Sequence, residues 1–348
     1  MVRFSDIIGK KLKRSDKVPS PEKESQGGKL WLSDSQIIKV EDTGDFSDPL
    51  SAEKYSEKSK AYFNQILEKA IEIQDKVKKN QGISHSPVLA ILHHIMDDDL
   101  IDELYEYATS IPDDYGMQSH TISVTFASLK VGKGLGYDTK KLLKLGLAAF
   151  LENLGMYKIP DHVLNKEGTL SPAEIATIRE HPEISAQIVG QMGESFKWLA
   201  ETALQIHERA DGSGYPNGLR GEEISEFASI IGLIDTYVAM IKNRPYRNKH
   251  IQTEAVKSVI ELGKGKFPTK VVKEFLNQIT LFPVNSFVRL NNKSIGRVLS
   301  TDKSRPLRPT IELLYDGLGS KTEGRKIIHL SESPLLHIVE TIDENGVP

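Results

Sequence analysis

The chain has 348 residues, of which 39% are hydrophobic and 27% are charged, a composition typical of a soluble globular protein with two or three domains. Its formal net charge of -3 provides no global basic field that would recruit nucleic acid. No run approaches the roughly 18 apolar residues of a membrane-spanning helix, and Met1 to Lys17 lacks the apolar core of a signal peptide. Cysteine is absent, which excludes disulfides and thiolate metal sites. We therefore expect a cytoplasmic protein with no membrane span and no nucleic-acid partner.

The N-terminal part of the chain divides into two regions. Residues 1–50 are rich in Lys, Ser, Asp, Glu and Pro, and we expect this charged segment to be poorly packed. Residues 51–112 carry two helical patterns. In the first, 52–80, apolar residues recur near a period of about 3.6, and the second runs from Ser86 to Ser110. We expect a helical region before the main domain.

Residues 113–280 are the most apolar part of the chain and have a helical pattern throughout. The stretches 142–155 and 228–241 are apolar nearly all round, as buried helices are. A third helix is predicted over 171–192, where Ser171, Pro172 and Glu174 provide a cap, a proline at the first helical position and a capping box.

The pattern changes after Phe282, so residues 281–348 are predicted to form a small β-rich extension. Short runs rich in Val, Ile and Leu alternate there with turn residues such as NNKS and DGLGS. The predicted fold class is therefore mainly α, with a helical bundle, an N-terminal helical region and a small sheet at the C-terminal end. The expected strands lie in SFVRL, IGRVLS, TIELLY, KIIHL and LLHIVETI.

Several polar residues interrupt the apolar helical patterns. Glu152 and Asn153 interrupt the helix predicted from Leu142 to Leu154, and Asp235 lies inside the other buried helix. His207 and Glu208 follow a further apolar run. Buried charges need partners, and a shared metal ion or an ion-pair network would satisfy several of them together. Taken singly, each is more simply explained by an ordinary pairing.

The stretch His207–Ser225 carries the most specific signal in the chain. Its sequence HERADGSGYPNGLRGEEIS contains four glycines and one proline directly after a helical pattern, which favours a tight, irregular loop. It includes Gly214-Tyr215-Pro216, while His181-Pro182 lies upstream and RPYR (244–247) downstream. With these motifs in this order, the chain resembles the HD-GYP family over about 113–277.

The resemblance implies an all-helical domain in which His and Asp side chains hold two or three iron-like metal ions. In that family a metal-bridging hydroxide attacks a phosphodiester of cyclic di-GMP, and two metals serve the attacking and leaving oxygens. Aligned with the family motifs, the metal-binding positions of this chain are occupied by His120, Glu152, His181, His207 and Asp235.

Four positions depart from the family pattern, and they make this a degenerate member. Glu152 and Asn153 replace the eponymous His-Asp pair, Met156 replaces a lysine near the phosphate, and Ile206 replaces one of two adjacent histidines. A neutral amide at Asn153 bridges two metals poorly. We expect either one iron or manganese ion or a metal-free network of buried His and carboxylate groups, and no intact binuclear site.

Ligand binding is expected to outlast catalysis. By resemblance, Arg244 and Arg247 are candidate phosphate contacts, and Tyr215 is a candidate stacking or hydrogen-bonding group. The loop Asp211–Glu223, called the GYP loop below, is nearly complete, and we expect it to bind a partner protein through exposed Tyr215 and Leu219. Its predicted charged rim consists of Arg220, Glu222 and Glu223.

Three functions remain open at this point. The first is a signalling module that binds cyclic di-GMP or a partner protein and has little or no phosphodiesterase activity. The second is an active metal-dependent cyclic di-GMP phosphodiesterase with an altered metal site. The third is a scaffold whose C-terminal sheet binds a partner and which binds no nucleotide.

Overall fold

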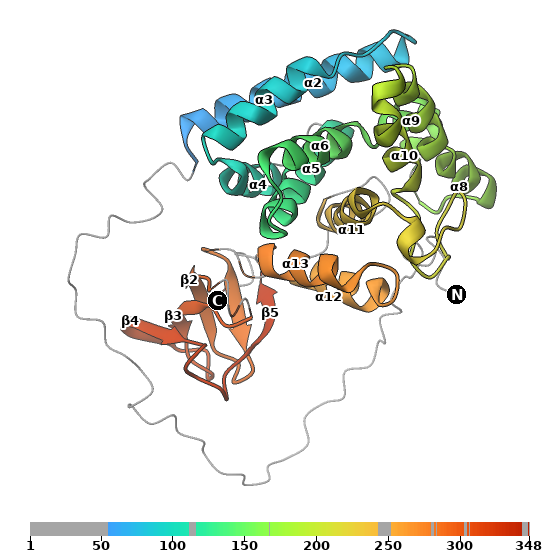
Figure 1. Ribbon diagram of the computed structural model, residues 1–348. Helices are drawn as coiled ribbons and strands as arrows, with labels where there is room; N and C mark the ends of the chain where they lie inside the picture. The colour runs from blue at the N-terminus through green and yellow to red at the C-terminus, as the bar shows by residue number, and fades with distance from the viewer. Residues whose placement is uncertain are drawn as a thin grey trace. The chain divides into compact units, whose positions relative to one another are not determined.

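The computed structural model describes residues 55–110, 116–166, 168–242, 252–279, 282, 284–302, 305, 307–342 and 347. The N-terminal segment 1–50 and the predicted phosphate contacts Arg244 and Arg247 lie outside the described residues. The described chain forms two compact units, a helical unit up to Ile279 and a sheet unit from Phe282 onward (Figure 1).

Three helices open the helical unit: α2 (Glu57–Lys78), α3 (Ser86–Asp97) and α4 (Ile101–Ser110). Ser56 caps α2 by accepting a hydrogen bond from the Ser59 backbone N–H. The helical stretch predicted from Ser86 to Ser110 is two helices, because Asp99 adopts a left-handed conformation with φ of 53° that ends the first of them. Asp is one of the residues that tolerate this conformation.

Helices α5 (Gly116–Gly134), α6 (Thr139–Leu151) and α11 (Glu226–Ile241) pack against one another in the middle of the helical unit (Figure 1). Every residue of α5 from Ser119 to Gly132 is buried. The helix that was predicted to continue to Leu154 ends at Leu151, and the 3-10 helix η2 (Leu154–Lys158) follows it. Glu152 and Asn153 therefore lie in the turn between α6 and η2, and the prediction that they interrupt a continuous helix is wrong.

The next segment contains α7 (Asp161–Leu164), α8 (Pro172–Arg179), α9 (His181–Gly190), η3 (Glu194–Phe196) and α10 (Lys197–Gln205). The capping box predicted for Ser171 and Glu174 is present at the start of α8. The single helix predicted over 171–192 is, however, two helices that meet at Glu180. Pro182 has no N–H and is better tolerated in the first turn of a helix than in its interior, so α9 begins at His181.

The helical unit is completed by η4 (Gly221–Glu223), α12 (Gln252–Gly263) and α13 (Thr269–Gln278). Among the described residues between 116 and 279 there is no β-strand, and the bridge between Asp211 and Arg220 is isolated. No helix in the described ranges is both long and apolar enough to span a bilayer. The predicted helical domain is confirmed.

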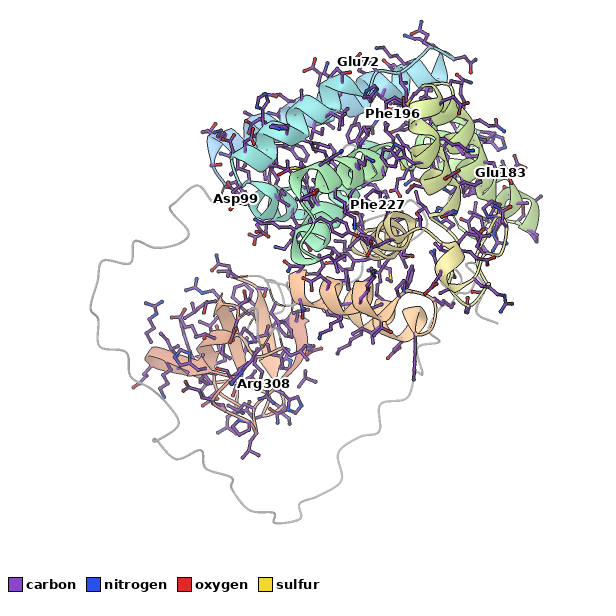
Figure 2. All side chains as sticks on the ribbon, viewed as in Figure 1. Glu72, Asp99, Glu183, Phe196, Phe227 and Arg308 are labelled. Carbon is purple, nitrogen blue, oxygen red and sulfur yellow. The ribbon has the colours of Figure 1, made fainter. Side chains whose placement is uncertain are left out.

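The sheet unit is a five-stranded antiparallel sheet with the order β4-β3-β2-β1-β5. Each run that was predicted to contain a strand does so, and Val288, Val298 and Ile311 are fully buried in this unit. Arg308, labelled in Figure 2, donates hydrogen bonds to the carbonyls of Leu330, Ser333, Leu336 and Pro334. The strands are β1 (Phe287–Leu290), β2 (Ile295–Ser300), β3 (Thr310–Tyr315), β4 (Lys321–His329) and β5 (Ile338–Ile342).

Candidate metal centre

Three of the predicted metal ligands meet where the central helices pack. His120 comes from α5, Glu152 follows α6, and Asp235 comes from α11. One ligand atom from each lies within 4.8 Å of the others, and His120 Nε2 is 2.8 Å from Asp235 Oδ1. The side chains of His120 and Asp235 are only 8% and 13% exposed. The bundle core thus holds these three residues, the metal triad, in a fixed arrangement.

Glu152 is the member of the metal triad that most needs a cation. Its Oε1 accepts a hydrogen bond from Asn153 Nδ2 at 3.1 Å, whereas its Oε2 is buried with no hydrogen-bond partner among the described residues. Burial, reinforced by the negative charge of Asp235, raises the pKa of Glu152 well above its ordinary value. A buried, half-satisfied carboxylate is unfavourable. A metal ion on the triad would satisfy this oxygen and stabilise the ionised form, so the donor set fits a cation.

His181 and His207 form a second cluster, the histidine pair. Their Nε2 atoms are 2.9 Å apart, and His181 Nδ1 is 2.7 Å from the Ile178 carbonyl oxygen. Because a carbonyl only accepts, His181 Nδ1 carries the proton, and the lone pair of its Nε2 faces His207 when the ring is neutral. Metal-binding histidines commonly have this arrangement. Two nitrogens bound at right angles to one ion at about 2.1 Å would lie about 3 Å apart, close to the observed separation.

Gly155 links the two clusters. A Cβ atom at Gly155 would lie 2.1 Å from the His181 carbonyl oxygen, so only glycine allows η2 to approach α9 this closely. The Gly155 N–H also donates to Ser185 Oγ at 2.8 Å. The structure therefore arranges the five predicted ligands as a triad and a pair, with the start of α9 held against the turn that carries Glu152.

Two positions that differ from the family pattern have become part of the apolar core. Met156 packs with Ile159, Val163 and Leu170 in an apolar cluster and is 8% exposed. Ile206 is 2% exposed, and its carbonyl lies so close to α11 that only a glycine, Gly232, fits opposite it. Neither side chain supplies a charge or a metal ligand.

Glu208 organises the GYP loop from within. Its Oε1 accepts hydrogen bonds from the backbone N–H groups of Asn217 and Gly218 at 2.6 and 3.1 Å, and its Oε2 accepts one from Leu219 at 3.0 Å. Glu208 is 2% exposed. The sequence showed only that this carboxylate needed a partner. The signal for its role was the glycine-rich loop that follows, because the backbone N–H groups of an irregular loop need acceptors.

Tyr215 faces the interior of the site. Its ring stacks on the His207 ring with centroids 5.0 Å apart and an angle of 3° between the planes. The Arg179 guanidinium lies 5.1 Å from the centroid of the Tyr215 ring. Tyr215 and Leu219 are half-buried, so the prediction that both are exposed anchors is wrong. Arg179 was not among the predicted site residues, because it comes from α8 and is brought to the loop only by folding.

Arg209 connects the segment just before the GYP loop to α11. Its guanidinium donates to the carbonyls of Ile206 and Glu208 at 2.9 and 2.7 Å and to Thr236 Oγ1 at 3.3 Å. Burial lowers the pKa of Arg209. Because protein oxygens accept these hydrogen bonds, we interpret Arg209 as a structural residue of the site.

Comparison with known proteins identifies both units of the chain. Residues 108–270 match the HD domain family, and residues 287–347 match the KOW domain associated with HD domain. The helical segment thus resembles an HD domain, and the small antiparallel sheet resembles a KOW domain.

The chain is similar to curated cyclic di-GMP phosphodiesterases over about half of its length or somewhat more. The chain is 28% identical over 214 residues to a cyclic di-GMP phosphodiesterase of Pseudomonas aeruginosa, a match covering 62% of this chain and 51% of the relative. It is 32% identical over 182 residues to a cyclic di-GMP phosphodiesterase of Thermotoga maritima, covering 51% and 50%. The chain thus spans about half the length of these relatives. The predicted resemblance to HD-GYP proteins is confirmed.

A solved structure supports the fold. An HDG"Y"P protein from Bdellovibrio bacteriovorus superposes with a TM-score of 0.52 at 19% sequence identity, covering 66% of this chain and 73% of that one. At this identity the likeness concerns the arrangement of helices.

Proposed function

We propose that this chain is a signalling module whose HD domain binds cyclic di-GMP beside one metal ion and hydrolyses it slowly or not at all. The observation that carries the proposal is the metal triad, in which Glu152 Oε2 is buried and without a partner among the described residues. The names of the curated relatives support cyclic di-GMP as the ligand.

The ligand types favour iron or manganese, because imidazole and carboxylate together suit these metals. His120, Glu152 and Asp235 would hold the ion, which supplies a Lewis acid that polarises a phosphoryl oxygen. The rest of the site belongs to the protein. The Tyr215 ring stacks on His207 of the histidine pair, while the Glu208 carboxylate holds the loop that carries Tyr215.

We expect weak hydrolysis because the residues that differ from the family pattern do not supply the groups that a two-metal reaction needs. A two-metal reaction needs ligands that bring both ions to the reacting phosphate. Asn153 is neutral, and its amide nitrogen is occupied by Glu152. Ile206 and Met156 are buried among apolar groups. These three positions supply neither a bridging charge, nor a further ligand, nor a cation for the phosphate.

The alternative, an active phosphodiesterase with an altered metal site, is favoured by one observation. The histidine pair is already arranged with the two Nε2 atoms 2.9 Å apart and with His181 Nδ1 held by a carbonyl. Such a pair would need little rearrangement to hold a second ion next to the metal triad.

One experiment separates the two functions. The full chain is purified, loaded with iron or manganese, and analysed for metal content, for cyclic di-GMP binding by calorimetry, and for linear product by chromatography. We expect one metal ion per chain and binding without appreciable turnover. Two metal ions per chain with sustained turnover would establish the phosphodiesterase instead, and a chain that binds no nucleotide would act only as a scaffold.

We also propose that the GYP loop binds a partner protein, through a surface other than the predicted anchors Tyr215 and Leu219. Because Tyr215 faces inward, we expect a partner to contact the longest exposed run of the GYP loop, Arg220 to Glu223. Rim charges of this kind set specificity and association rate more than affinity. Charge reversal at Glu222 and Glu223 should weaken capture of a cyclic di-GMP synthase domain and leave nucleotide affinity unchanged.

A further inference from the structure

Arg179 closes a three-layer stack over the candidate site. It is the last residue of α8 and is exposed, and its guanidinium lies 5.1 Å from the Tyr215 ring. The Tyr215 ring in turn lies parallel to the His207 ring, whose Nε2 contacts His181. The stack therefore runs from the protein surface to the histidine pair, with a permanent positive charge at its outer end.

Nothing in the described part of the chain engages this charge with a carboxylate. No ion pair of Arg179 occurs there, and its contact with the Tyr215 ring is a cation–π interaction. Such a contact leaves the N–H donors of the guanidinium, five in total, available for an anion. Arg209 is different, because carbonyl oxygens and Thr236 already accept hydrogen bonds from its guanidinium.

The positive charge of Arg179 lies close to the Tyr215 side chain. Burial raises the pKa of the Tyr215 hydroxyl, whereas the positive charges of Arg209 and Arg179 oppose that rise. Both cations therefore lie within electrostatic reach of the phenol oxygen, and of these two only Arg179 is exposed. Met156, by contrast, is sealed in an apolar cluster that includes Ile178, the residue before Arg179.

We infer that Arg179 is a phosphate-binding residue of this site, which contacts a phosphodiester of the bound cyclic dinucleotide while its guanidinium stacks on Tyr215. The inference rests on the proposed function, because it requires a cyclic dinucleotide to bind. Arginine suits the role, since its planar fork both stacks on aromatic rings and binds phosphate oxygens in pairs.

The test is a titration of the metal-loaded full chain with cyclic di-GMP. Hydrogen bonds to charged groups are worth enough that Arg179→Ala should weaken binding by roughly 10- to 100-fold. Arg179→Lys should recover part of the loss, because it restores the charge without the planar fork. Arg325→Ala, which removes an exposed arginine of the KOW domain, is the matched control and should bind like the wild-type chain.

Salt dependence separates a phosphate contact from support of the tyrosine ring. An ion contact with phosphate makes affinity fall as salt rises, so Arg179→Gln should show a shallower dependence than the wild-type chain. Affinity for Mn²⁺ alone should be the same in both. Equal cyclic di-GMP affinity for wild type and Arg179→Ala would overturn the inference and leave the proposed function standing. Failure of the wild-type chain to bind cyclic di-GMP would overturn both.

Discussion

The metal triad and the GYP loop are neighbours in the HD domain, yet they are held by different kinds of interaction. The triad depends on side chains from two helices and from the turn after α6, and one carboxylate oxygen within it has no hydrogen-bond partner among the described residues. The loop depends on backbone: Glu208 binds three of its N–H groups, and Gly214 fits where a Cβ would lie 2.4 Å from the backbone at Glu208 and Arg209. The shape of the loop therefore does not depend on the side chains of the metal triad.

The largest effect should come from the loop. Glu208→Ala leaves three backbone N–H groups without their buried acceptor, and unsatisfied buried donors are expensive. We expect the free energy of unfolding to fall by about 3 kcal/mol or more, measured by denaturant titration. Glu222→Ala, at an exposed position of the same loop, should change it by less than about 0.5 kcal/mol. Equal stability of both variants would show that Glu208 does not organise the loop.

The second prediction concerns the metal triad. Glu152→Gln keeps the shape of the side chain but removes the charge that a cation needs. With metal at about a hundredfold excess over Kd, wild type should gain about 2.7 kcal/mol of stability, while the variant gains little. Chelator should abolish the metal-dependent gain of the wild type, because no free metal then remains to bind the folded state.

The matched control for that variant is Glu183→Gln. Glu183 is exposed on α9 and labelled in Figure 2. Thermal melts of the three proteins with and without Mn²⁺ provide the measurement. Metal stabilisation of Glu152→Gln equal to that of the wild type would exclude Glu152 as a ligand.

A third prediction tests whether the altered positions limit hydrolysis. The combined variant Glu152→His, Asn153→Asp, Met156→Lys and Ile206→His restores the family residues. We expect cyclic di-GMP turnover to rise at least about tenfold, equivalent to about 1.4 kcal/mol of barrier, but to remain below that of an active relative. The limit is packing, because Met156 and Ile206 are buried among apolar residues and tolerate polar replacements poorly. No gain in turnover, in a variant shown to bind two metal ions, would mean that other positions limit hydrolysis.

The smallest effect is electrostatic and lies at the start of α8. The hydrogen bond from Lys166, followed by those from Ser171, lowers the pKa of Glu174 from 4.5 to about 2. A lowered pKa means that the ionised form favours the folded state, so this contribution is present above pH 4.5 and disappears as the pH falls toward about 2. Glu174→Gln should therefore melt slightly below wild type at pH 6 and alongside it near pH 2. A difference that does not change with pH would assign the role of Glu174 to the capping hydrogen bond alone.

Local patterns were enough to predict much of the fold. The capping box at Ser171, the strand runs after Phe282 and the helical periodicity each depend on neighbours in sequence, and all three are found in the structure. The errors arose where helices end. In a sequence, a proline in the first turn of a helix cannot be told from one inside a helix, and Pro182 belongs to the first kind. The turn at Glu152 and Asn153 lies within an apolar run, so the sequence alone suggests that the helix continues.

The site was predictable only as a set of positions. Alignment with family motifs marked the five candidate ligands, but it could not divide them into a triad and a pair, because that division depends on how α9 packs on η2. The inward orientation of Tyr215 and the contact between Arg179 and the Tyr215 ring likewise depend on tertiary structure. Whether the five residues bind metal, and whether Arg244 and Arg247 contact phosphate, remain predictions.

The close approach at Gly155 fixes the distance between the two clusters of predicted metal ligands, although Gly155 is not one of those ligands. The distance between the turn bearing Glu152 and the start of α9 is fixed by backbone atoms in contact, with room for a hydrogen and not for a methyl group. Gly155→Ala would therefore move the start of α9 away from the turn that carries Glu152, and it would separate the histidine pair from the metal triad without replacing any of the five predicted ligands. A residue that is not itself a predicted ligand thus fixes the spacing between the two clusters of predicted ligands.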